Sequence, residues 1–415
     1  MRDSWHESDE VSLHGARCAI GPQETFRASI HIAGGHLTQV VRDGTMSLPL
    51  VSGETEIDLS GFLLLPGLVN AHDHLQFALY PRLGNPLYQN YIEWGEDIHV
   101  RFPEVIAKHK SVPKDVRLWW GGIRNLLCGV TTACHHDKFW SELQKREFPI
   151  KVVRHFGWGH SLALGGDLRA ARCATPEGSV FILHACEGVD DQARDEVFEL
   201  YRLGLLDAHT VLVHGLAMDH EGVALVQERG ASLIVCPSSN MFLFGKLPDM
   251  NLLGKIESVA LGNDSPLTAA GDLLDEVRFA IRSCSITPES AYRMVTEAAA
   301  TILRLKDGEG KIRILGPGDL VAIRDTGHNA ASRLQTLSMI EIEFVMIAGR
   351  VQLASEEVWK RLPSQVKEGL EPLLVEGVVR WLRAPVKELL RRAEEVLGAG
   401  EVRLGGRTVC SPVLQ

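Results

Sequence analysis

The stretch FLLLPGLVNAHDH, at residues 62–74, decides the fold and points to the chemistry. It begins as an apolar run of strand length, is interrupted by Pro66 and Gly67, and ends in two histidines two positions apart. Residues i and i+2 of a strand point to the same side, so His72 and His74 are expected to present both imidazoles together. Outward from this stretch the same pattern recurs, with short apolar runs that end in polar side chains.

Seven such runs are separated by polar or amphipathic segments, and three of those segments have helical spacing: Asp190–Leu203, Glu221–Arg229 and Gly271–Cys284. The runs are Phe62–Val69, Val130–Cys134, Lys151–Phe156, Val180–Leu183, Thr210–Val213, Ser232–Val235 and Ser258–Leu261. Strands that alternate with helices predict an α/β fold with a parallel sheet buried on both faces. This many units in about 250 residues predicts a TIM-type (β/α)8 barrel over residues 62–315. Because only seven strands are clear, and the segment 158–178 is short, one strand is expected to be distorted or missing.

The two ends of the chain have a different pattern. Ser29–Ala33 and Leu37–Val41 flank Gly34-Gly35, which predicts a β-hairpin. Short apolar runs return at Asp319–Ile323 and Phe344–Ala348. We therefore expect residues 1–61 and 316–354 to form one small β-sandwich-like domain, with the barrel inserted between its halves.

Residues 355–415 are predicted to be a C-terminal helical extension, because Val375–Leu397 has apolar positions at helical spacing. Arginines at 380, 383, 391 and 392 are interleaved with them. Two interpretations stay open: a helix that packs on the barrel with a solvated basic face, or a helix that binds a partner. A homo-oligomer is therefore left open.

Composition limits the class of protein. The chain has 415 residues, 45% hydrophobic and 23% charged, which is ordinary for a soluble globular protein. Its net charge of -10 gives no reason to expect a nucleic-acid partner. Eight scattered cysteines without a C-x-x-C pair are not a disulfide framework. No apolar stretch is long enough for a membrane span, and Met1–Glu7 lacks the apolar region of a signal peptide, so we expect a cytoplasmic protein.

Polar residues at the ends of three predicted strands suggest a metal site. His72 and His74 end the first, His184 ends a middle strand, and Asp264 follows the last. The carboxyl ends of barrel strands meet at one mouth, where active sites are built. Three imidazole nitrogens and one carboxylate suit one divalent ion, zinc first, with iron or manganese as alternatives. An open position on such an ion would take a water molecule.

Further residues near these strand ends are candidates for proton transfer. Glu187 follows His184 by three positions and is placed to shuttle protons, provided that a dry pocket raises its pKa. His214 ends the next strand and could stabilise an oxyanion or the water. Asp264 could both bind the metal and orient the water.

Candidate substrate contacts lie in loops and at other strand ends. They are Arg82, Trp94, His135, His136, Trp158 and His160. Aromatic side chains there could stack on a planar ring, and a guanidinium could pair with a carboxylate or phosphate. The alternative is that the aromatic residues pack their loops onto the barrel and that the two adjacent histidines are structural.

Several motifs together resemble the amidohydrolase superfamily, in the branch of cytosine, guanine and adenosyl-homocysteine deaminases and triazine hydrolases. They are LPGLVNAHDH at 65–74, H-x-x-E at 184–187, VHG at 213–215, CPSSN at 236–240, LGNDS at 261–265, and MVTEAA at 294–299 followed by GDLV at 318–321. The resemblance covers about Ser29–Ala354. It implies one metal on His72, His74, His184 and Asp264, with Glu187 as proton shuttle and His214 polarising the water.

Two departures from the family pattern matter. The stretch between His155 and Val180 is short, which puts one barrel strand and part of the substrate pocket in doubt. Binuclear members use a carboxylated lysine on a middle strand, whereas the nearest candidate, Lys151, starts its strand. We therefore expect one metal ion.

Two reactions fit these residues: hydrolytic deamination of an amino-substituted nitrogen heterocycle, which we favour, and ring-opening or amide C–N hydrolysis. Both would use a small heterocyclic substrate and the same metal and carboxylate. A non-catalytic scaffold would be expected to lose ligands, which are all present. The P-loop, the H-E-x-x-H helix, the G-x-S-x-G elbow and the P-C-x-x-C deaminase signature are absent from the sequence.

Overall fold

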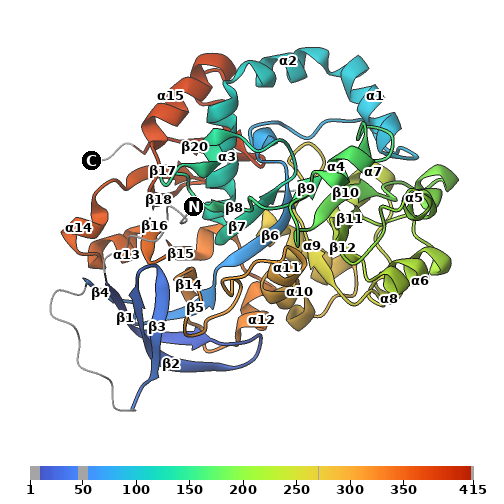
Figure 1. The fold of residues 1–415 in the computed structure, drawn as a ribbon. Helices are drawn as coiled ribbons and strands as arrows, with labels where there is room; N and C mark the ends of the chain where they lie inside the picture. The colour runs from blue at the N-terminus through green and yellow to red at the C-terminus, as the bar shows by residue number, and fades with distance from the viewer. Residues whose placement is uncertain (1–9, 45–54, 270, 413–415) are drawn as a thin grey trace.

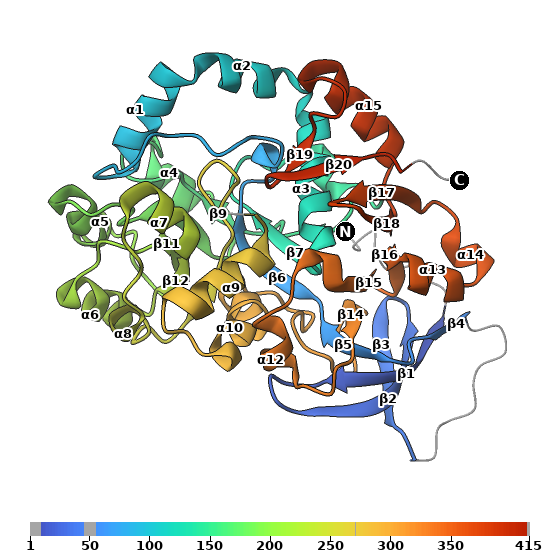
Figure 2. The same cartoon turned by 180° about the vertical axis from the view of Figure 1, so that it is seen from behind.

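A computed structural model describes residues 10–44, 55–269 and 271–412 of the chain. Parts of the predicted small β domain, residues 1–9 and 45–54, lie outside this description. Figures 1 and 2 show the N-terminal strands and the C-terminal elements together on one side of the molecule. The parallel strands of the middle of the chain lie on the other side, with helices α5, α6 and α8 on their outer face.

Eight parallel strands form two sheets, of which one has the order β6-β7-β8 and the other β13-β12-β11-β10-β9. Their bounds are β6 Leu68–Asp73, β7 Val130–His135, β8 Lys151–Val152, β9 Gly157–Trp158, β10 Phe181–Ala185, β11 Thr210–His214, β12 Ser232–Val235 and β13 Val259–Leu261. The sheets meet beside β6, where Asp73 and Asp264 form a parallel bridge. The Asp264 amide donates to the His72 carbonyl, and the His74 amide donates to the Asp264 carbonyl, both at 3.1 Å. An α/β fold with parallel sheets is thereby confirmed.

The strand that the sequence left uncertain is β9. It has only two residues, which pair with Phe181 and Ile182 of β10. The predicted strand Lys151–Phe156 is wrong beyond Val152, because β8 ends there. Residues 153–156 then lead directly to β9 and leave no room for a helix between the two strands. β9 was missed because two residues carry no detectable period.

The two ends of the chain join in one mixed twelve-stranded sheet, whereas a small β-sandwich-like domain was expected there. Leu320 of β14 pairs with Pro66 of β5, and β5 pairs with β1. The strands are β1 Val11–Ala19, β2 Thr25–Ala33, β3 His36–Arg42, β4 Thr55–Asp58, β5 Phe62–Pro66, β14 Leu320–Arg324, β15 Ile342–Ile347, β16 Arg350–Ser355, β17 Glu371–Val375, β18 Val378–Leu382, β19 Arg403–Leu404 and β20 Arg407–Cys410. The predicted hairpin is present, with Gly34 and Gly35 both at positive φ between β2 and β3.

The apolar run Phe62–Val69 is two strands rather than one. β5 belongs to the large sheet and β6 to a parallel sheet, with Gly67 between them. A Cβ at Gly67 would lie 2.1 Å from Thr131 Oγ1, so no larger residue fits at this crossing. The predicted boundary between residues 61 and 62 therefore falls one strand too early.

The prediction of a helical extension over residues 355–415 is wrong, because this segment adds four strands to the large sheet. Glu376 and Gly377, both at positive φ, form a two-residue turn between β17 and β18. Leu382 of β18 pairs with Leu353 of β16. Only the second half of the expected helix exists, as α15 after Pro385. It packs against α2 and α3, which supports the first of the two interpretations left open for it.

Three helices appear where the spacing predicted them, α5, α6 and α9, each with an aspartate N-cap. The helices are α1 Tyr91–Arg101, α2 Pro103–Ser111, α3 Lys114–Leu127, α4 Leu168–Cys173, α5 Asp191–Arg202, α6 His220–Arg229, α7 Pro237–Phe244, α8 Met250–Leu253, α9 Leu273–Ser283, α10 Pro288–Met294, α11 Glu297–Ile302, α12 Ala330–Leu334, α13 Glu356–Arg361, α14 Ser364–Lys367 and α15 Val386–Leu397. None of the helices described here has the length and apolar character needed to cross a lipid bilayer.

Candidate active site

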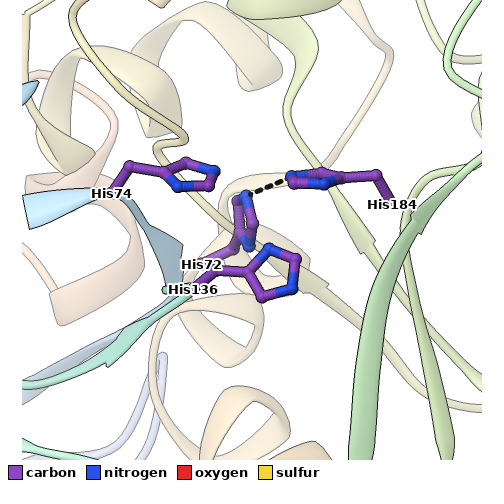
Figure 3. A group of neighbouring side chains, drawn as sticks. All are labelled: His72, His74, His136 and His184. Atoms are coloured by element: carbon purple, nitrogen blue, oxygen red, sulfur yellow. Dashed lines mark hydrogen bonds between the residues drawn. The ribbon is translucent and has the colours of Figure 1, made fainter. Parts of the chain in front are cut away.

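Four histidines converge at the carboxyl ends of the parallel strands (Figure 3). His72 and His74 come from the end of β6, His136 follows β7, and His184 lies on β10. Each offers a ring nitrogen, and these four atoms all lie within 4.8 Å of one another. His72 Nε2 and His184 Nε2 are 3.2 Å apart. Such a group of nitrogens is the donor set that zinc and similar divalent ions prefer.

Hydrogen bonds to backbone carbonyls fix how two of these rings lie. His184 Nδ1 is 2.8 Å from the carbonyl oxygen of His160, so it donates there and leaves Nε2 as the lone pair that faces His72. His136 Nε2 lies 3.1 Å from the Gly159 carbonyl, which makes Nε2 the donor and Nδ1 the free lone pair. The Nδ1 atoms of His72 and His136 are buried without a partner among the described residues. Carbonyl-oriented rings and unsatisfied nitrogens are what a metal site requires, so these residues fit a metal ion.

Burial favours the neutral form of three of these imidazoles, which is the form that binds a metal. Burial, with the neighbouring histidines, lowers the pKa of His74, His136 and His184 well below the usual value. A protonated ring could not contribute its nitrogen lone pair. The low-dielectric surroundings therefore prepare the cluster for a cation.

Asp264 adds a carboxylate to the cluster. Its Oδ1 lies 3.7 Å from His72 Nε2 and 3.6 Å from His74 Nε2. Its Oδ2 accepts hydrogen bonds from the hydroxyls of Ser239 and Thr268, both at 2.8 Å. Burial opposes ionisation, but the interaction with His72 and the other neighbouring imidazoles holds the pKa of Asp264 below its usual range. One oxygen is thus anchored by hydroxyls while the other faces the histidines as an anion.

Glu187 and His214 form a second pair beside the cluster. Glu187 Oε1 lies 3.5 Å from His214 Nε2. The other ring nitrogen of His214 donates to Asn240 Oδ1 at 2.9 Å, which turns Nε2 toward Glu187. Burial, with the negative charges of Asp264 and Glu196, raises the pKa of Glu187 well above its usual value. Burial lowers the pKa of His214 to about 4, so this ring is neutral at physiological pH.

The strand ends that carry these residues have an unusual backbone. Cys186, His214 and Asp264 have φ values of 55°, 76° and 52°, in the left-handed region that disfavours residues other than glycine. Gly262 allows the close approach of the chain to His72, whose Cβ would lie 2.6 Å from an added Cβ. Strained backbone at three site strands is typical of a functional site whose surroundings hold it in place.

A buried network holds the histidine-bearing strand from behind. Asp73, which lies between His72 and His74, accepts two hydrogen bonds of 2.8 Å from Arg124 Nη2 of α3. Amide groups of Asn125 and Asn70 also donate to Asp73 Oδ2, at 2.7 and 3.0 Å. The same Asn70 accepts the Asn263 amide, next to Asp264. The network therefore links both metal-competent strand ends to one helix.

A pocket of about 460 Å³ opens onto this site. Of the predicted metal and catalytic residues, those that line it are His74, His184, Glu187, His214 and Asp264. Of the predicted substrate residues, Trp94 and His160 also line it. Trp94 lies in α1, and its indole donates to the Leu83 carbonyl at 2.9 Å, so it also anchors the preceding loop to this helix.

The other four predicted substrate residues do not line the pocket. Arg82 is exposed and stacks over the Phe242 ring, 4.6 Å from its centre. His135 accepts the Leu75 amide at 3.3 Å, and Trp158 packs edge-on against His136. His136 joins the metal-competent cluster instead. Their roles toward a substrate stay a prediction.

Sequence reasoning assigned no role to several supporting residues. Ser239, Asn240 and Thr268 orient Asp264 and His214. Their position after β12 and β13 was the available signal, since polar residues there face the same rim. Lys151, the lysine that the sequence offered as a candidate for a second metal, instead forms an ion pair with Asp319 at 3.0 Å.

The fold and this site together define an α/β protein whose parallel strands end in a metal-competent centre. A family model described as "Amidohydrolase family" matches residues 160–351. A 5-methylthioadenosine/S-adenosylhomocysteine deaminase of Natronomonas pharaonis is 26% identical over 436 residues, covering 92% of this chain and 97% of the relative. An imidazolonepropionase of Klebsiella pneumoniae is 24% identical over 69% of this chain and 83% of its own length.

A solved structure of an adenosine deaminase from Xanthomonas campestris with bound zinc shares the fold. Its TM-score is 0.65 at 17% identity, over 93% of this chain and 97% of that one. These comparisons support the resemblance of the chain to the amidohydrolase family, on its deaminase branch. The chain is accordingly an enzyme of the class that hydrolyses carbon–nitrogen bonds.

Proposed function

We propose that the chain is a metal-dependent hydrolytic deaminase of an amino-substituted nitrogen heterocycle. The observation that carries the proposal is the meeting of His72, His74, His184 and Asp264 beside the Glu187–His214 pair, at the end of one pocket. The deaminase names of relatives that match nearly the whole chain support the same reaction.

We further propose that the eight parallel strands form one distorted (β/α)8 barrel, with residues 62–315 as its approximate extent. The joined edges of β6 and β13, and the strand order of both sheets, support this arrangement. The short strands β8 and β9, which belong to different sheets and do not pair with each other, would be the distorted part.

We propose that His72, His74, His184 and Asp264 hold one divalent ion. Zinc is favoured, because three imidazoles and a carboxylate suit it and because a structural relative binds zinc. An ion of this kind supplies Lewis acidity and lowers the pKa of water toward neutrality when it is bound. The ion pair of Lys151 with Asp319 supports one ion rather than two.

Glu187 would move the protons. Its carboxylate, held at the pocket wall, would take one proton from water and deliver it to a ring nitrogen of the substrate. It would then take the remaining proton of the newly added hydroxyl and deliver it to the amino group, which leaves as ammonia. His214, neutral and held by Asn240, would accept a hydrogen bond from the nucleophilic water at Nε2 and so orient it. Burial of Glu187 and His214 excludes bulk water from these transfers.

A second reaction, ring-opening C–N hydrolysis, is supported by the imidazolonepropionase relative. It would need the same residues, so the site geometry does not separate the two. We expect the enzyme to act in the cytoplasm on small molecules.

The products decide between them. Purified enzyme would be incubated with aminopurines, aminopyrimidines, aminopterins, aminotriazines and cyclic amides, with ammonia and the ring absorbance followed together. Deamination releases ammonia and leaves an intact aromatic chromophore. Loss of the chromophore without ammonia would instead establish ring opening. If the metal-loaded enzyme gave neither result, both proposed reactions would be excluded.

A further inference from the structure

Helices α2 and α3 form one wall of the pocket, and three positively charged side chains line this wall. They are Lys110 at the end of α2, and Lys114 and Arg117 at the start of α3. Asp137 is the one carboxylate among the lining residues besides Glu187 and Asp264, which belong to the catalytic cluster. This wall therefore carries an excess of positive charge, although the whole chain is acidic.

Asp137 is already occupied. Its Oδ2 lies 3.1 Å from Lys114 Nζ, and its Oδ1 accepts the Lys138 amide at 2.6 Å. Lys114 also lies over the Trp140 ring, 5.1 Å from its centre. Lys114 and Asp137 thus largely compensate each other, which leaves Lys110 and Arg117 as the unbalanced charges.

Arg117 is buried and has no ion-pair partner within the described parts of the chain. It is only 8% exposed. Its Nε donates to the Val112 carbonyl at 2.9 Å and its Nη1 to the Gln76 carbonyl at 3.4 Å. Its Nη2 has no hydrogen-bond partner among the same residues. A guanidinium keeps its charge, and a buried unpaired charge is unfavourable, so the pocket presents a cation ready for an anion.

The pocket surface near these cations is mostly apolar. Its lining includes Phe77, Tyr80, Ile98, Ile106 and Leu267, which pack in one cluster with Trp94. A ligand that reaches from the histidine cluster to Arg117 must therefore combine a polar ring, an apolar arm and a negative charge.

We propose that Arg117 and Lys110 form an anion subsite, so that the preferred substrate is an amino-heterocycle with an apolar arm that ends in a carboxylate or phosphate. Arginine binds both groups through parallel hydrogen bonds. The nature of the ring rests on the proposed deaminase function, whereas the anion subsite rests on the pocket alone.

Ligand-observed NMR titrations of the metal-loaded enzyme with hexanoate, hexanamide and inorganic phosphate test the subsite without turnover. Hexanoate and hexanamide share an apolar arm and differ in charge. We expect hexanoate to bind about tenfold more tightly than hexanamide, as expected for one charged hydrogen-bond pair. Arg117→Met should abolish that preference. Lys110→Met, at an exposed position that does not endanger folding, should weaken hexanoate about two- to threefold.

Lys108→Met is the matched control, because Lys108 is an exposed lysine of the same helix outside the pocket lining, and it should change nothing. Phosphate binding that depends on Arg117, without hexanoate binding, would support the subsite and identify phosphate as the group. Equal binding of hexanoate and hexanamide, with no Arg117-dependent phosphate binding, would overturn the proposal. So would anion binding that survives both Arg117→Met and Lys110→Met, since it would then lie at the metal.

Ammonia release and metal content, measured on the same preparations, separate this inference from the proposed function. Arg117-dependent hexanoate binding in an enzyme that deaminates nothing would leave the subsite and remove the deaminase. Deamination with no preference for anionic ligands would support the proposed deaminase function and exclude the anion subsite.

Discussion

The ion pair between Arg124 and Asp73 gives a prediction whose size follows from the structure. The two side chains are 3% and 0% exposed, and one guanidinium nitrogen reaches both carboxylate oxygens at 2.8 Å. Arg124→Met would leave the Asp73 carboxylate buried with only amide donors. Removing one partner of such a pair destabilises a fold by about 3–5 kcal/mol. Because Asp73 separates His72 from His74, metal affinity should fall as well, by about 10–100-fold.

Urea unfolding at pH 7 and competition with a zinc chelator measure the two effects. Arg392→Met is the control. Arg392 pairs with Asp115 of α3, the helix that also carries Arg124, but these two side chains are 30% and 37% exposed. This variant should therefore lose no more than about 1 kcal/mol of stability. The double variant Arg124→Met/Asp73→Asn should regain much of the loss, since no charge is then left unpaired. A loss below about 1 kcal/mol for Arg124→Met, with unchanged zinc affinity, would refute the reasoning.

Glu187→Gln should retain metal and fold but lower turnover by about 10²-fold or more, measured as ammonia release, and near-normal turnover would exclude Glu187 as the proton shuttle. His72→Ala and Asp264→Ala should lose bound metal and activity together, and tight metal binding in both would mean that the ligands are misassigned. Burial raises the pKa of Glu196 from 4.5 to about 7, so the folded state holds its proton where the unfolded chain releases it. The stability that this group contributes is complete below pH 4.5 and falls by up to about 3 kcal/mol as the pH rises through 7. Between pH 5 and pH 8, the free energy of unfolding measured in urea should therefore fall less for Glu196→Gln than for the parent protein. An equal fall with pH in both proteins would contradict the raised pKa of Glu196.

The parts of the fold that repeat a clear period were predictable. The aspartate-capped helices α5, α6 and α9 and the Gly34-Gly35 hairpin follow from local sequence. The two-residue strand β9 did not, since it exists only through its pairing with β10. The C-terminal strands β17 and β18 were mistaken for a helix because the spacing of Val and Leu there fits both the helical period of about 3.6 residues and the strand period of about two. Only the left-handed turn at Glu376-Gly377 distinguishes them.

The candidate site was predictable to the extent that strand ends converge. His72, His74, His184 and Asp264 could be grouped because carboxyl ends of parallel strands share one rim. The place of His136 depends on which of two adjacent histidines turns inward, and that follows from its hydrogen bond to the Gly159 carbonyl. The basic wall of the pocket arises from helix packing across loops, for which the sequence has no local pattern.

Metal analysis of the purified protein, combined with X-ray absorption at the edge of the metal found, tests whether the histidine cluster is a metal centre. We predict about one ion per chain, ringed by nitrogen and oxygen ligands at about 2.0–2.2 Å. A protein that stays metal-free after zinc supplementation, or an ion with sulfur ligands at about 2.3 Å, would contradict it.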